Sequence, residues 1–146
     1  MGKVTQTMAW PVDLVRQEDG TILVSFADIP EALTEGATRT EALAHAEDCL
    51  TAALGGYLGT RRDIPAPSAA RGRPLVALPA LVAAKVALYR AMRAEDIGNT
   101  ALAARLGVSE GAVRRLLDLN HRSHIGQIEK ALQAFGQRLT ISTQAA

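Results

Sequence analysis

Apolar and polar residues alternate with a period of two over residues 10–26, in two arms separated by a polar stretch. The apolar positions of the two arms are Trp10, Val12 and Leu14, then Ile22, Val24 and Phe26. Between the arms, Glu18-Asp19-Gly20 supplies a glycine for the positive φ angle of a tight turn. The pattern predicts a β-hairpin, and Pro11 places the first strand at an edge or at its own start because proline cannot donate to a ladder. A third short strand is expected around residues 32–35.

The spacing of apolar residues changes to three and four after Thr38. Thr38-Arg39-Thr40-Glu41 has the form of a capping box, in which the Thr hydroxyl and the Glu carboxylate bind backbone amides at a helix start. A helix is therefore expected to begin there. Its predicted buried stripe consists of Ala42, Leu43, Ala46, Leu50, Ala53, Leu54 and Tyr57.

The chain loses its periodic pattern over residues 65–74, where proline, glycine and small residues dominate. We interpret residues 65–73 as a flexible linker. The short apolar run 75–78 that follows predicts one more strand joining the first sheet. A helix with an apolar stripe over 81–92 is then expected, and Gly98 ends it.

The stretch from Asn99 to Leu117 predicts two helices joined by a tight turn. Ala103 is small where two helices would cross, Gly107 suits a positive φ angle, and Asn99 and Ser109 can cap the two helices. The shared core is predicted to contain Leu102, Leu106, Val108, Val113 and Leu116. This pattern indicates a helix-turn-helix and resembles Cro/repressor-type DNA-binding domains over about residues 80–136. An ordinary helical hairpin with a glycine turn is the alternative.

A last helix, capped by Ser123, is expected to bury Ile125, Ile128, Leu132 and Phe135. Residues 138–143 then alternate and are rich in β-branched side chains, which predicts a strand at the end of the chain. A lone strand cannot satisfy its own edges, so it is expected to pair with another subunit. The C-terminal domain should therefore form a homodimer or a tetramer.

The 146 residues carry a net charge of only +1, but the charge is divided along the chain. Residues 1–70 hold five basic and ten acidic side chains, a net of −5, whereas residues 71–146 hold eleven basic and five acidic ones, a net of +6. Such a division suggests two modules with different partners, although solvated faces of one domain would also give it. One cysteine excludes a disulfide framework, and no apolar run is long enough for a membrane span, so a cytoplasmic protein is expected.

The basic module offers a set of candidate DNA-binding residues. Arg114, on the exposed side of the second helix of the motif, is the best candidate for a bidentate contact to guanine, and Arg115 could do the same or bind phosphate. Ser109 and Asn99 lie at helix starts, where phosphates bind. The full set is Asn99, Ser109, Glu110, Gly111, Arg114, Arg115, Asn120 and Arg122.

Three stretches of the acidic module resemble the N-terminal domain of HicB-type antitoxins. They are residues 18–30, Thr34-Glu35-Gly36-Ala37-Thr38, and the helix opening at Glu41-Ala42. The chain departs from the family pattern with Ala27 in place of a proline and with Glu31-Ala32 in place of Gly-Cys. The resemblance implies a reduced ribonuclease H-like sheet and helix that binds and silences HicA, an mRNA-cleaving ribonuclease. Residues 122–139 also look like the C-terminal part of helix-turn-helix HicB proteins.

The sequence thus predicts an α+β protein with two domains. Residues 8–78 form a small antiparallel sheet with one helix and bind a HicA-like toxin through a surface that the sequence does not identify. Residues 79–146 form a helix-turn-helix domain with a terminal strand, which binds operator DNA and represses the chain's own toxin–antitoxin operon. No catalytic residue, metal site, cofactor or membrane partner is expected. The alternatives are a transcription regulator whose N-terminal domain senses a ligand or a protein, and a metal-dependent nuclease acting through Asp13, Glu47 and Asp48.

Overall fold

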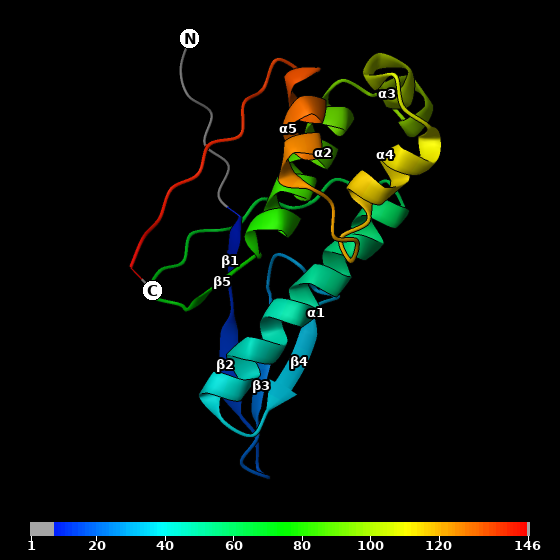
Figure 1. Cartoon of the computed structure of the whole chain (residues 1–146). Coiled ribbons are helices and arrows are strands. Elements are labelled where there is room, and N and C mark those ends of the chain that lie inside the picture. The colour runs from blue at the N-terminus through cyan, green and yellow to red at the C-terminus, as the bar shows by residue number, and fades with distance from the viewer. Residues whose placement is uncertain (1–7, 146) are drawn as a thin grey trace. The chain divides into compact units, whose positions relative to one another are not determined.

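The computed structural model describes residues 8–145 and divides into two compact units, with the boundary between Pro79 and Ala80 (Figure 1). The N-terminal unit contains β1 (Ala9–Pro11), β2 (Asp13–Arg16), β3 (Ile22–Ser25), β4 (Leu33–Gly36), α1 (Arg39–Gly59) and β5 (Leu75–Ala77). The C-terminal unit contains α2 (Ala80–Ala94), α3 (Asn99–Leu106), α4 (Glu110–Leu117) and α5 (Ile125–Gln133). Small antiparallel sheets followed by helices confirm the predicted α+β class.

The predicted hairpin is formed by β2 and β3, and β4 pairs with the other edge of β3. Gly20 adopts a φ angle of 89° in the turn. There the carboxylate of Asp19 accepts hydrogen bonds from the hydroxyl and the backbone N–H of Thr21, at 2.6 and 2.9 Å. These bonds lower the pKa of Asp19 below its usual value. The local chemistry of the turn therefore sets the register of the hairpin.

The first arm of the hairpin is divided, which the alternating pattern did not predict. Residues on either side of Val12 belong to different sheets: β1 pairs with β5, whereas β2 pairs with β3. Pro11 ends β1 and lacks the N–H needed to continue a ladder, so the chain changes partners at this point. The run 75–78 contains the predicted strand, β5, but the strand does not join the sheet of β2, β3 and β4 as expected. It pairs with β1 in a separate two-stranded sheet, with Trp10 opposite Val76.

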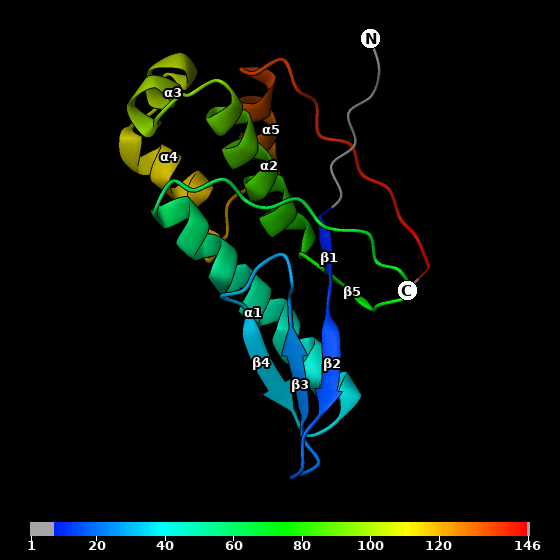
Figure 2. The same ribbon diagram turned by 180° about the vertical axis from the view of Figure 1, so that it is seen from behind.

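Helix α1 lies across one face of the three-stranded sheet (Figure 2). It begins where the capping box predicts, with the Thr38 hydroxyl accepting from Glu41 N–H at 3.1 Å. The helix approaches β4 so closely that a Cβ atom on Gly36 would lie 2.4 Å from the backbone nitrogen of Ala42. Of the predicted stripe, Ala42, Ala46, Leu50, Leu54 and Tyr57 are buried, while Leu43 and Ala53 are half-buried.

The segment interpreted as a flexible linker, residues 65–73, connects α1 to β5 inside the N-terminal unit. The indole of Trp10 donates to the carbonyl oxygen of Pro65 at 3.0 Å. Asp28 accepts from both the backbone and the hydroxyl of Ser68, at 3.0 and 2.9 Å. These bonds tie the segment to the sheet layer, although it forms neither helix nor strand.

Four expectations about the C-terminal unit need correction. Gly98, not Asn99, is the N-cap of α3, and His124, not Ser123, is the N-cap of α5. The terminal strand is not formed within the chain, because residues 137–145 have no helix or strand structure and the side chain of Ile141 is 83% exposed. A single strand at the end of one chain has no ladder partner there, which is the physical reason for its absence. Ile125, expected to be buried, is 40% exposed.

Candidate nucleic-acid interface

Helices α3 and α4 are joined by a three-residue turn whose geometry follows from its residue types. Gly107 adopts a φ angle of 67°, and its backbone N–H bonds the carbonyl oxygens at the end of α3. The Ser109 hydroxyl then accepts from Ala112 N–H at 3.1 Å and caps α4. Ala103 is buried and accepts the Val108 N–H at 3.1 Å, so the chain returns close to α3. The sequence predicted the positive φ angle of Gly107, the cap of Ser109 and the need for a small residue at Ala103.

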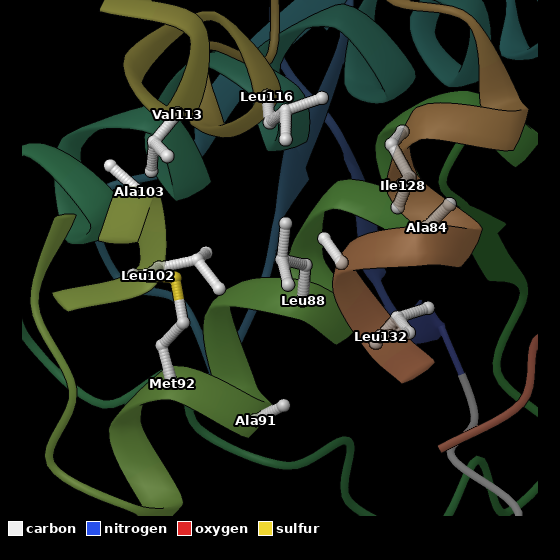
Figure 3. Packing of buried hydrophobic residues seen from close by; sticks show 11 residues of the cluster. Ala84, Leu88, Ala91, Met92, Leu102, Ala103, Val113, Leu116, Ile128 and Leu132 are labelled. Carbon is white, nitrogen blue, oxygen red and sulfur yellow. The ribbon is translucent and has the colours of Figure 1, made fainter. Parts of the chain in front are cut away.

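One apolar cluster fixes α4 against the rest of the C-terminal unit. Figure 3 shows side chains from α2, α3, α4 and α5 pointing toward a common centre. Leu102 and Val113 are fully buried and Leu116 nearly so, as predicted. Val108 does not fill the core as expected, since 45% of its surface is exposed. With its apolar side committed to this core, α4 presents its polar side to solvent.

The structure places seven of the eight candidate residues on α4 and in its two flanking loops, and the eighth, Asn99, at the start of α3. Arg114 and Arg115 are exposed on α4, and neither side chain forms an ion pair with a residue in the described range 8–145. Ser109 and Glu110 are exposed at the start of α4, and Gly111 is half-buried there. The remaining three are Asn99, half-buried in the first turn of α3, and Asn120 and Arg122, exposed between α4 and α5.

Glu110 has a structural partner that sequence reasoning missed. The hydroxyl of Thr100, in the first turn of α3, donates to a carboxylate oxygen of Glu110 at 2.5 Å. Glu110 also lies in the first turn of α4, where a negative charge suits the helix dipole. The hydrogen bond from Thr100 joins the starts of α3 and α4, so Glu110 stabilises the turn between these helices.

Lys85 is the second feature that the sequence interpretation missed. The side chain lies at a position of the apolar stripe of α2 and is fully buried. Its ammonium donates to the carbonyl oxygens of Arg115 and Asp118, at 2.8 and 2.7 Å, and to the Ser123 hydroxyl at 2.9 Å. Burial lowers the pKa of Lys85, and the charge of Asp118 opposes that shift. The signal in the sequence is the lysine itself, because a cation within an apolar stripe indicates a buried charge with partners elsewhere in the chain.

The three bonds of Lys85 act on the C-terminal end of α4 and on the loop that follows. The last carbonyl groups of a helix lack partners within the helix and carry partial negative charge. Lys85 supplies a partner and a positive charge to these groups, and through Ser123 it also fixes the end of the loop that carries Asn120 and Arg122. The orientation of the exposed arginines on α4 therefore depends on a residue of α2.

The acidic residues considered for nuclease chemistry do not form a site. Asp13 is on β2 and lies 3.7 Å from the guanidinium of Arg73, whereas Glu47 and Asp48 are exposed on α1. Over residues 8–145, no group of three His, Cys, Asp or Glu side chains is close enough together to hold a metal ion. The geometry that two-metal hydrolysis requires is therefore not present in the described part of the chain. In the same range, no helix has the length and apolar character needed to cross a membrane.

Comparison with known proteins gives matches over nearly the whole chain. Residues 9–87 match a family model described as the HicB_like antitoxin of bacterial toxin–antitoxin system. The chain is 41% identical over 138 residues to Antitoxin HicB 2 of Photorhabdus laumondii subsp. laumondii, an alignment that covers 94% of this chain and 98% of the relative. It is 40% identical over 134 residues to Antitoxin HicB of Pseudomonas fluorescens, covering 90% and 92% of the two chains. Antitoxin HicB of Escherichia coli strain K12 is 36% identical over 135 residues, covering 92% and 98%.

Proposed function

Because the chain belongs to the HicB-like antitoxin family of bacterial toxin–antitoxin systems, we propose that it neutralises a HicA-like mRNA-cleaving ribonuclease and represses its own operon. The N-terminal unit, which is proposed to be a reduced ribonuclease H-like domain, binds the toxin directly. The C-terminal unit binds operator DNA as a helix-turn-helix, in the cytoplasm and as a homodimer or tetramer. Membership of an antitoxin family agrees with the prediction that the chain is not an enzyme.

The observation that carries the DNA-binding proposal is the geometry of α3, its turn and α4. A recognition helix must be held by its apolar side and present cations to the major groove. Helix α4 meets both conditions, with Val113 and Leu116 in the core and with Arg114 and Arg115 exposed and unpaired among residues 8–145. The net charge of +6 over residues 71–146 favours a polyanionic partner.

The toxin-binding proposal is supported by the opposite charge of the other unit. A ribonuclease that holds an RNA backbone needs a basic surface, and an acidic partner is attracted to such a surface. Residues 1–70 carry a net charge of −5. Co-expression with the neighbouring reading frame tests this part: growth rescue and co-purification are expected. If neither occurs, the alternative of a regulator with a sensing domain becomes the better hypothesis.

The DNA-binding part is tested by two double variants at the same positions. Arg114→Ala with Arg115→Ala removes both cations, and we expect loss of operator binding with toxin binding unchanged. Arg114→Lys with Arg115→Lys keeps the charges but not the planar fork that pairs with guanine. The lysine variant should therefore keep salt-dependent binding to any DNA while losing discrimination for the operator, by about 5- to 150-fold for each guanine contact.

These outcomes are measured by fluorescence anisotropy with operator and scrambled duplexes over a range of salt concentrations. The dissociation constant of the unsubstituted chain should rise steeply with salt, since several phosphate contacts release counterions. A flat salt response, or operator preference retained by the alanine variant, would contradict the assignment of α4. Loss of DNA binding together with loss of toxin binding would contradict the division of functions between the two units.

A further inference from the structure

The three-stranded sheet of the N-terminal unit has one face that α1 does not cover. The strand register places two rows of three residues on this face, Val15–Leu23–Glu35 and Asp13–Ser25–Leu33. The opposite face carries the buried residues Ile22 and Val24, together with Gly36, which contacts the first turn of α1. We call the six residues of the two rows the open face. In Figure 2 the open face is turned toward the viewer, with α1 behind the sheet.

The open face has an apolar centre that a solvated sheet does not need. Val15 and Leu33 are 54% and 59% exposed, which makes them two of the few large apolar side chains in the described range with such exposure. Leu23, half-buried on the central strand, is directly opposite Val15 and diagonal to Leu33, close enough for contact. The three side chains therefore form one continuous apolar strip across all three strands. Contiguous exposed apolar surface of this kind marks interaction sites more often than scattered single residues do.

The free edge of β4 is less suited to a partner than the face is. An unpaired edge strand offers backbone groups to another strand unless the protein blocks it. Here two side chains of α1 reach the outer carbonyl oxygens of β4. The Nδ1 atom of His45 lies 2.8 Å from the Glu35 oxygen, and the Cys49 thiol lies 3.6 Å from the Leu33 oxygen. A partner therefore meets the side chains of the open face in preference to the edge.

The charges around the apolar strip define the chemistry of that partner. Glu35 is exposed at one end of the first row, and Asp13 at the end of the second row lies 3.7 Å from the guanidinium of Arg73. None of the six residues of the open face is basic. We propose that the open face is where the toxin docks, through a protein surface with basic groups around an apolar centre. This inference rests on the proposed function, because the basic character of the partner follows from its binding of RNA.

Substitutions on the open face test the inference in the full-length chain. Val15→Arg combined with Leu33→Arg removes the two exposed apolar contacts and places cations opposite a basic surface. We expect the dissociation constant for the cognate toxin, made catalytically inactive, to rise at least about 100-fold by calorimetry. The matched control is Leu75→Arg, since Leu75 is also a strand residue of the N-terminal unit and is 54% exposed, but lies in the other sheet. The control should stay within about twofold of the unsubstituted chain.

The fluorescence of Trp10, the only tryptophan of the chain, reports whether the N-terminal unit of each variant is folded. If the arginine variant unfolds, Val15→Thr with Leu33→Thr keeps β-forming residues and should still weaken binding more than the control does. Toxin affinity equal to that of the control in both variants would overturn the inference while leaving the proposed function intact. Dissociation of a dimer of the free chain with toxin affinity unchanged would overturn it in favour of a second copy as the occupant. Failure of the unsubstituted chain to bind the toxin would refute the proposed function itself.

Discussion

Replacement of Lys85 by methionine separates the contribution of the buried cation from that of its aliphatic chain. Methionine keeps an unbranched apolar side chain of similar length, so the cluster around α2 loses little volume. What is lost is the ammonium and its three hydrogen bonds, to the oxygens of Arg115, Asp118 and Ser123. The variant therefore tests whether these bonds stabilise the end of α4.

The expected loss of unfolding free energy depends on the hydrogen bonds that each acceptor oxygen keeps after the substitution. Hydrogen bonds to charged groups contribute about 1.5–3 kcal/mol each, so three of them set an upper range of about 4.5–9 kcal/mol. The loss is smaller because the Asp118 oxygen still accepts from His121 N–H at 3.0 Å, and the Arg115 oxygen from Asp118 N–H at 3.3 Å. Removing a buried charge also recovers part of its desolvation cost. We expect the C-terminal unit to lose about 3 kcal/mol of unfolding free energy, which is below that range.

Two optical probes report on the two units separately. Most helical residues lie in the C-terminal unit, whereas the only tryptophan, Trp10, is buried in the N-terminal unit. For a domain of this size, 3 kcal/mol lowers the midpoint of thermal unfolding by about 12–24 °C. Lys85→Met should shift the main far-ultraviolet circular dichroism transition by this amount and leave the Trp10 fluorescence transition in place. Lys130→Met, at an exposed position of α5, is the control and should shift neither.

Operator binding provides the second measurement on the same variant. Below its lowered midpoint, the Lys85→Met chain should bind operator DNA more weakly than the Lys130→Met control does, because the end of α4 and the loop up to Ser123 are less fixed. Toxin affinity should be equal in the two variants. An unchanged circular dichroism transition, or an equal shift of the Trp10 transition, would refute the reasoning.

Two further predictions concern the N-terminal unit. Gly36→Ala should destabilise this unit by about 1–3 kcal/mol or more, measured by the Trp10 transition in urea, because the new Cβ would lie 2.4 Å from the backbone of Ala42. Gly55→Ala, inside α1 with no atom within 4 Å of the new Cβ, should instead be neutral or stabilising by up to about 1 kcal/mol. The second prediction concerns the loss of stability at acidic pH. A hydrogen bond from its own backbone and one from the Tyr57 hydroxyl, at 2.8 Å, lower the pKa of Glu31. Because the folded pKa is the lower one, this contribution to stability is complete above the unfolded value of about 4.3 and is lost as pH falls through the folded value. The unfolding free energy of the Glu31→Gln variant should therefore fall less steeply than that of the unsubstituted chain between about pH 5 and pH 3. Parallel plots of unfolding free energy against pH for the two proteins would contradict this account.

Local sequence rules succeeded wherever one residue type satisfies a backbone requirement. Thr38 and Ser109 cap the helices that they were predicted to cap, and Gly107 has the left-handed geometry that the turn needs. Each of these roles depends on neighbours within four residues in the sequence. The rules therefore predicted where α1 and α4 begin, and with them which side chains of α4 are exposed.

The sequence-based predictions were incomplete where the deciding partner is distant in the chain. The break in the first strand depends on the pairing of β1 with β5, which lies more than sixty residues later. Ser123 was expected to cap α5, but its hydroxyl is engaged by Lys85, and Glu110 is held by Thr100 of the preceding helix. Periodicity alone placed Lys85 in an apolar stripe and could not identify the carbonyl oxygens that make its burial possible.

The net charge of +1 is the sum of an acidic N-terminal part and a basic C-terminal part, which suit partners of opposite charge. At physiological ionic strength, charges are screened beyond about 8 Å, so a partner responds to the charges of the surface that it touches and not to the sum over the chain. Helix α1, with 21 residues, is about 30 Å long, several times that distance. An acidic residue at one end of this helix therefore contributes little to the field at the other end. For this reason the low total does not argue against DNA binding, and moving a positive charge from the C-terminal unit to the N-terminal unit should weaken DNA binding and toxin binding together at constant net charge.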